Sequence, residues 1–143
     1  MADDRARVKA GRTIGYPWRV TFDPGEAFLQ TTIYKISPRA LWRDAEAAGI
    51  FAGAPVDHTD GFIHFSTAAQ LAETAAKHFA GQSDLLLVGA DAARLGEALR
   101  WEPSRGGALF PHLYGALELA AVTRVEPLPL GPDGRHCFPV LAG

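Results

Sequence analysis

The alternation of apolar and polar positions is clearest in residues 60–81, DGFIHFSTAAQLAETAAKHFAG. After an Asp-Gly turn signal, residues 62–65 (FIHF) form a short aromatic run that is typical of a strand. Apolar residues then recur every fourth position, at Leu71, Ala75 and Phe79, and this spacing predicts one face of a helix that a glycine ends. The pattern therefore predicts a strand, a turn and a helix in close succession.

Two hydroxyl side chains, Ser66 and Thr67, lie at the predicted start of that helix. Both residue types suit an N-cap, and the free N–H groups of a helix N-terminus favour an anion such as phosphate. Strand alternation places His64 and Ser66 on one face and Ile63 and Phe65 on the other. We therefore expect a histidine and a hydroxyl to face the same turn.

The rest of the chain contains further elements of both kinds. Residues 32–36 are β-branched and predict a strand, Ser37 and Pro38 suit a helix start, and Gly49 suits its end. Residues 84–90 are almost continuously apolar, as in a strand buried on both faces. Shorter strands are expected at 99–102 and 117–125. The helices gather in one half and the strands in the other, which predicts an α+β fold with two main helices.

Composition limits the classes of protein that fit. The chain has 143 residues, of which 48% are hydrophobic, enough for one domain with a sizeable core. The net charge of −2 argues against nucleic-acid or membrane partners, and a single cysteine, Cys137, suits a reducing cytoplasm. Residues 1–30 mix charge, Gly, Pro and aromatics without a period, and we expect a flexible or draped extension. Residues 31–143 are expected to form a single domain.

The candidate catalytic side chains begin with two histidines. His64 suits proton exchange near neutral pH, although an isolated strand-end histidine is more often structural. His112 and Tyr114 are two positions apart in FPHLYG, so they share a face if this segment is extended. Tyrosine offers a stacking surface, and histidine offers a donor or an acceptor.

Charged residues add three further candidates. Glu102, between Trp101 and Pro103, is a carboxylate at a strand end, with Glu118 as its rival and a surface ion pair as the plainer explanation. Lys35 is a candidate for contact with an anionic ligand. A metal site is not expected, because residues 57–64 lack the ligand spacing that zinc prefers.

The order of several motifs resembles a bacterial family known as domain of unknown function 952. These motifs are IYKI, DGFIHFST, LRWEPSRGG, FPHLYG and PLPLGPDGRH, and together they span residues 32–138. The family's fold is similar to that of the ADP-ribosyltransferases, which hold NAD between two small sheets. The resemblance therefore implies a split β-sheet core in place of a single sheet.

The same resemblance implies roles for individual residues. Lys35 or Tyr34 stands where those transferases have a basic residue on the first strand, and residues 65–67 (FST) match their second motif. Glu102 or Glu118 would be the carboxylate that stabilises the ribosyl cation, although neither lies in a Q/E-x-E motif. The expected protein is thus a nucleotide-binding one, with NAD as a candidate substrate and no firm cofactor.

Two other classes of function remain open at this stage. One is a non-catalytic module that binds a small nucleotide-like ligand. The other, placed lower, is a two-histidine phosphoesterase, because residues 64–66 (HFS) resemble half of its H-x-[ST] pattern. Such enzymes need a second copy of the pattern, and residues 112–114 (HLY) lack the matching hydroxyl placement. The expected pocket lies where FIHFST meets FPHLYG: Ser66 and Thr67 bind a phosphate, Tyr34 and Tyr114 pack on a ring, and the two histidines supply hydrogen bonds. The oligomeric state is open.

Overall fold

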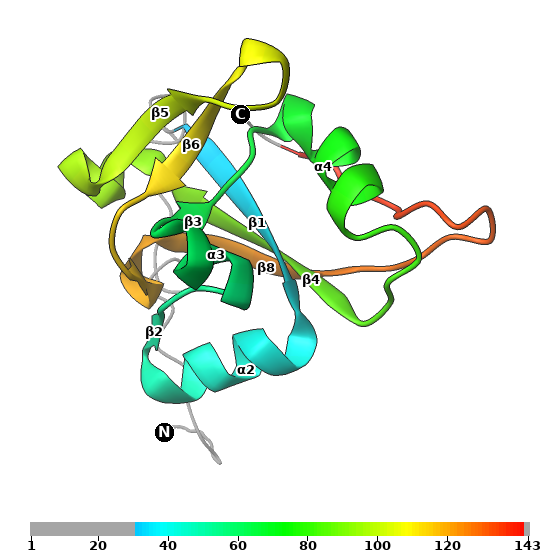
Figure 1. Ribbon diagram of the computed structural model, residues 1–143. Helices are drawn as coiled ribbons and strands as arrows, with labels where there is room; N and C mark the ends of the chain where they lie inside the picture. The colour runs from blue at the N-terminus through cyan, green and yellow to red at the C-terminus, as the bar shows by residue number, and fades with distance from the viewer. Residues whose placement is uncertain (1–30, 142–143) are drawn as a thin grey trace.

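The computed structural model describes residues 31–141, and these residues form an α+β fold with three small antiparallel sheets (Figure 1). The α+β class predicted from the sequence is confirmed. The extension expected at residues 1–30 lies outside the described residues. Within the described part, no helix is long and apolar enough to span a membrane.

The first sheet has the strand order β1-β4-β8 and forms the centre of the domain. Its strands are β1 (Thr32–Pro38), β4 (Leu85–Asp91) and β8 (Val122–Leu128). Every residue of β4 is buried, which confirms the buried strand expected from its apolar run. Because β4 is the middle strand, both its edges are paired and both its faces are covered.

The two faces of this sheet belong to two hydrophobic clusters. Tyr34 and Ile36 of β1 pack with Leu71 and Ala75 of α4 (Leu71–His78). On the opposite face Ile33 packs in the cluster that contains α2 (Arg39–Ala48) and the second three-stranded sheet. Alternation along β1 therefore puts Tyr34 toward α4 and sends Lys35 toward the second sheet.

The second three-stranded sheet has the order β3-β6-β5 and carries the candidate site. Its strands are β3 (Ile63–His64), β6 (Leu109–Leu113) and β5 (Leu99–Pro103). Tyr34 of β1 and Ser66, just beyond β3, exchange two backbone hydrogen bonds of 2.8 Å, which tie this sheet to the first. A two-stranded sheet of β2 (Ile50–Phe51) and β7 (Leu117–Glu118) completes the set.

Several helix boundaries differ from those that the sequence pattern predicts. α2 begins at Arg39, because Pro38 is still the last residue of β1, and it ends as expected at Gly49 with φ 85°. The helix expected after Thr67 starts as a 3₁₀ turn, Ala68–Gln70, before α4. α4 ends at His78, and its C-cap is Phe79 rather than Gly81.

Two further segments contain elements that the sequence pattern does not predict. A short helix, α3 (Pro55–Asp60), lies between β2 and β3. The strand expected at 117–125 is divided, because the 3₁₀ turn Leu119–Ala121 separates β7 from β8. Elsewhere, the Asp91 carboxylate accepts a hydrogen bond from the Ala93 amide and so caps the 3₁₀ turn that follows β4.

Candidate functional site

One face of the β3-β6-β5 sheet carries a continuous set of polar and aromatic side chains. His64 of β3 and Arg100 of β5 both lie opposite His112 of β6, and Glu102 lies opposite Phe110. Residues directly opposite each other in an antiparallel pair point to the same face. The other face is apolar, with Ile63, Phe65 and Leu113 in the core. The sheet is therefore amphipathic, with its chemistry gathered on one side.

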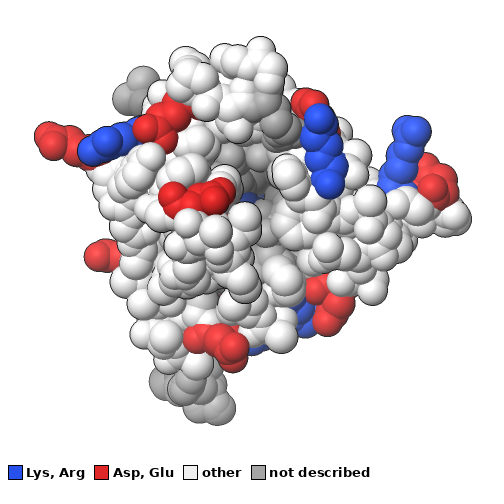
Figure 2. All heavy atoms as spheres, in the orientation of Figure 1, with Lys and Arg blue, Asp and Glu red and all other residues white. Residues whose placement is uncertain are grey.

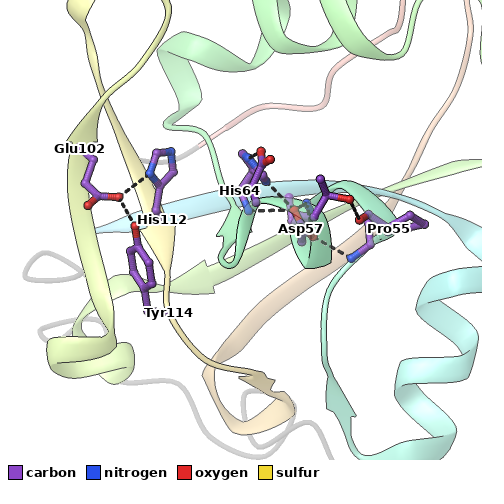
Figure 3. Close-up of polar contacts among 10 residues, drawn as sticks. Pro55, Asp57, His64, Glu102, His112 and Tyr114 are labelled. Carbon is purple, nitrogen blue, oxygen red and sulfur yellow. Dashed lines mark hydrogen bonds and ion pairs between the residues drawn. The ribbon is translucent and has the colours of Figure 1, made fainter.

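The two histidines lie next to each other, as the sequence analysis expected of the two motifs. Their ring centroids are 5.7 Å apart in an edge-to-face arrangement. Phe62 links them, because its ring stacks on His112 at 4.1 Å and lies 4.6 Å from the ring of His64. In Figure 3 both imidazoles point to the same side of the strands that carry them.

His112 is fixed by a carboxylate and keeps one ring nitrogen without a partner. Its Nδ1 lies 2.8 Å from Glu102 Oε1, and the Tyr114 hydroxyl donates to the same oxygen at 2.8 Å (Figure 3). Because the carboxylate accepts, Nδ1 carries the proton, and Nε2 of the neutral ring is a lone-pair acceptor. Within residues 31–141 no hydrogen-bond partner of Nε2 is found, although only 6% of the residue is exposed.

The pKa values of this cluster follow from those hydrogen bonds. Hydrogen bonds from His112 first, and from Tyr114 second, lower the pKa of Glu102 below its ordinary range. The hydrogen bond to Glu102 also raises the pKa of Tyr114, because the hydroxyl keeps the proton that it donates. Glu102 is therefore an anion near neutral pH. The guanidinium of Arg100 lies over the Tyr114 ring, 4.8 Å from its centroid, so an exposed cation stands beside this anion.

His64 is held by carboxylates at both ring nitrogens. Nδ1 lies 2.6 Å from Asp57 Oδ1, and Nε2 lies 2.9 Å from Asp60 Oδ2. A carboxylate only accepts, so both contacts are hydrogen bonds when the ring carries two N–H groups and is the imidazolium. His64 is one-third exposed and Asp57 is buried, with 2% exposure. Both ring nitrogens of His64 thus face carboxylates, whereas only Nδ1 of His112 does.

Asp57 joins the site to the central sheet. It accepts hydrogen bonds from the backbone amides of Ala54, at 2.7 Å, and His64, at 3.1 Å, and its carboxylate lies 2.9 Å from Lys35 Nζ. Burial alone would raise the pKa of Asp57, but the His64 hydrogen bond and the Lys35 charge outweigh it and lower the pKa to about 2. Burial lowers the pKa of Lys35, and Asp57 opposes this effect.

The remaining residues expected at the site lie elsewhere in the network. Lys35 is bonded to Asp57 and is 6% exposed, and Tyr34 is fully buried in the core. The buried Ser66 hydroxyl lies 2.9 Å from Thr74 Oγ1. The Thr67 amide donates to Gln70 Oε1 at 3.0 Å, so its N–H is already satisfied. One amide and one hydroxyl of the turn expected to bind a phosphate are therefore bonded to the protein's own groups.

Four residues that the sequence analysis did not place at the site are part of it: Asp57, Asp60, Phe62 and Arg100. Asp57 and Asp60 were considered only as metal ligands. The signal for the pair was their position at the Asp-Gly turn: Asp57 lies seven residues before His64, and Asp60, the first residue of the turn, lies four before it. Phe62 shares the alternation of His64, and Arg100 shares that of Glu102. In residues 31–141, no group of three His, Cys, Asp or Glu side chains is placed to hold a metal ion.

One face of the molecule is hollowed beside the second three-stranded sheet (Figure 2). Figure 2 shows a recess near the middle of one face, between the β3 and β6 part and α4, with a basic group visible in its floor and an acidic group at its rim. A cavity of about 220 Å³ adjoins the network, since Asp57 and Phe62 help to line it. A second cavity, of about 480 Å³, lies against Leu113, on the opposite face of the β3-β6-β5 sheet from the histidines.

Fold and site together define a small α+β protein whose sheet face carries two histidines, each oriented by a carboxylate. The chain belongs to the family described as "Protein of unknown function (DUF952)", whose model matches residues 36–125. This match confirms the family that the sequence motifs resemble.

Solved structures of one relative show the same fold. The crystal structure of protein CC0527 from Caulobacter crescentus is 53% identical, has a TM-score of 0.73 and covers 75% of this chain and 94% of that one. Its solution NMR structure is 54% identical, with a TM-score of 0.67 and coverage of 73% and 90%. A search of the curated proteins finds no match.

Proposed function

We propose that the His64–His112 face is an acid–base site that cleaves a phosphodiester bond in a small nucleotide-like ligand. The observation that carries this proposal is Nε2 of His112: it has no partner among residues 31–141, and it belongs to a buried residue beside His64, whose two ring nitrogens both face carboxylates. Buried polar atoms in folded proteins nearly always have a partner, so an unpaired one marks a place for a ligand atom.

The two histidines divide the chemistry between them. His112 Nε2 accepts the proton of an attacking hydroxyl, from water or from the ligand's own ribose, as the new P–O bond forms. His64 donates a proton to the leaving oxygen as the old P–O bond breaks, so the proton gained equals the proton lost. Glu102 stabilises the positive charge that His112 acquires, and Arg100 supplies an exposed cation for the phosphate.

A second candidate is cleavage of an NAD-like ligand at its ribose. Glu102 favours it, because an ionised carboxylate beside the Tyr114 ring suits a ribosyl cation. The expected ADP-ribosyltransferase-like core would place this acid near the nicotinamide. Against it, Lys35 is bonded to Asp57 and Tyr34 is buried, so neither first-strand residue is available to NAD. We therefore place this candidate second.

The test is turnover of two probes by the full chain. For a ribonucleoside cyclic phosphate, the assay measures hydrolysis of the phosphate ester. For NAD, it measures release of nicotinamide. The proposal is supported if the wild type hydrolyses the cyclic phosphate and if the rate falls at least about a hundredfold in His112→Gln and in His64→Gln. The matched control is His78→Gln, since His78 is an exposed histidine on α4. Its rate should equal that of the wild type.

The other outcomes decide among the remaining functions. Nicotinamide release that Glu102→Gln abolishes would favour the NAD candidate. Ligand binding without turnover of either probe would make the protein a binding module. Thermal unfolding of each variant separates loss of chemistry from loss of fold. We place the protein in the cytoplasm, where the exposed thiol of Cys137 would stay reduced.

A further inference from the structure

Asp60 occupies the nitrogen of His64 that the proposed reaction requires. Its Oδ2 lies 2.9 Å from Nε2, and its side chain is 44% exposed at the end of α3. In the reaction, that same nitrogen has to face the leaving oxygen or its phosphate. A ligand anion and the Asp60 carboxylate therefore compete for one N–H group.

His64 does not need Asp60 to keep its orientation. Asp57 already holds Nδ1 at 2.6 Å and also accepts from the His64 backbone amide, so side chain and main chain are fixed by one buried carboxylate. Phe62 packs against the ring at 4.6 Å. The contact with Asp60 is solvent-exposed and can be lost at small cost, because exposed pairs contribute little to stability.

We propose that Asp60 is a built-in competitor that holds the place of an anionic group, so that the ligand binds by displacing this carboxylate from His64. The inference rests on the proposed function, which makes His64 the proton donor. The group displaced is a carboxylate that accepts one charge-assisted hydrogen bond, so the incoming group is an anionic oxygen, as in a phosphodiester.

The position of His112 suits the same exchange. Its unpaired Nε2 belongs to a ring whose centroid is 5.7 Å from that of His64, and both rings point to the same side (Figure 3). Inorganic phosphate that replaces Asp60 carries a P–O–H group that can donate to this second nitrogen, whereas the Asp60 carboxylate has no proton to donate. Displacement thus exchanges one hydrogen bond for two contacts.

The experiment removes the competitor and measures phosphate binding directly. Inorganic phosphate is titrated into the wild type, Asp60→Asn and Asp60→Ala, and the imidazole signals of His64 are followed by NMR. We expect both variants to bind phosphate about three- to tenfold more tightly, the effect of removing one exposed like charge. Glu73→Gln on α4 is the control: it changes net charge equally at a 59%-exposed carboxylate, and its affinity should stay within about twofold of the wild type.

Failure of this inference and failure of the proposed function give different results. Tighter phosphate binding by both Asp60 variants supports the inference even if no probe is turned over, and only the catalytic proposal is then lost. Unchanged or weaker binding overturns the inference. So does a lower kcat with unchanged KM for the cyclic phosphate, because Asp60 would then position His64 for catalysis rather than compete with the ligand.

Discussion

Replacing Asp57 by asparagine tests whether this one carboxylate holds the core and the site together. Asp57 is 2% exposed, and the side chain that it neutralises, Lys35, is 6% exposed. Asparagine is nearly the same size but carries no charge, so Lys35 would be left as a buried and uncompensated cation. Removing one partner of a buried pair costs about 3–5 kcal/mol. The backbone hydrogen bonds to Ala54 and His64 would also weaken.

We therefore expect Asp57→Asn to lower the free energy of unfolding by about 3–4 kcal/mol. For a chain of this length the melting temperature should fall by about 12–16 °C. Urea unfolding followed by circular dichroism measures the loss. In the double variant with Lys35→Met, about 2 kcal/mol should be recovered, because no buried charge is then left unpaired.

The control is an exposed ion pair of the same type. Arg39 Nε lies 2.8 Å from Asp84 Oδ1, with the two side chains 39% and 70% exposed. Asp84→Asn should cost less than about 1 kcal/mol, and asparagine also tolerates the φ of 60° at this position. A cost below about 1 kcal/mol for Asp57→Asn, or strictly additive effects in the double variant, would refute the coupling described here.

Three further predictions concern stability. The folded pKa of Asp57 is about 2 against an ordinary 3.8, so its ionised carboxylate should contribute about 2 kcal/mol to the free energy of unfolding above about pH 4. This contribution should disappear as the pH falls toward 2. Urea midpoints measured across that range should show the fall, and Asp57→Asn should lack it. Trp42→Ala should cost about 3–5 kcal/mol by urea unfolding, since the ring is fully buried and lies 5.4 Å from Phe51; a loss under 1 kcal/mol would contradict this packing. Gly49→Ala should lower stability by about 1 kcal/mol through backbone strain alone, because φ is 85° and no atom of a neighbouring segment in the described residues lies within 4 Å of the added methyl group. Gly115→Ala is the control: its nearest atom is at 3.9 Å, and the substitution should be close to neutral. Thermal melts of the two variants measure both effects.

The sequence was informative where one short period decides the structure. The apolar run of β4 identified a strand covered on both sides, and alternation placed His112 with Tyr114 on one face. Each of these inferences needs only neighbouring residues, because side chains in a strand alternate between its two faces. The order of the predicted helices and strands indicated the α+β class, and the likeness of the motifs to a known family identified the family.

The sequence could not supply the contacts that cross between distant segments. The register that sets His64 opposite His112 joins residues 48 positions apart, and no local period encodes it. Asp57 was missed because α3 has only six residues, too short for a helical period, although Pro55 at its start and an acid at its third position are N-terminal signals. Ser66 shares the alternation of His64, yet its backbone pairs with Tyr34, and its hydroxyl is buried against Thr74.

The alternating faces of β6 have a consequence for how this protein can change over generations. Single substitutions can alter His112 or its neighbours one at a time and leave the hydrophobic interior as it is. A one-residue insertion or deletion within β6 is different, since it would turn Leu113 to the polar face of the sheet and the His112 imidazole to the apolar face. Natural variation in length should therefore collect in the segment around Gly106 and Gly107, outside the strands.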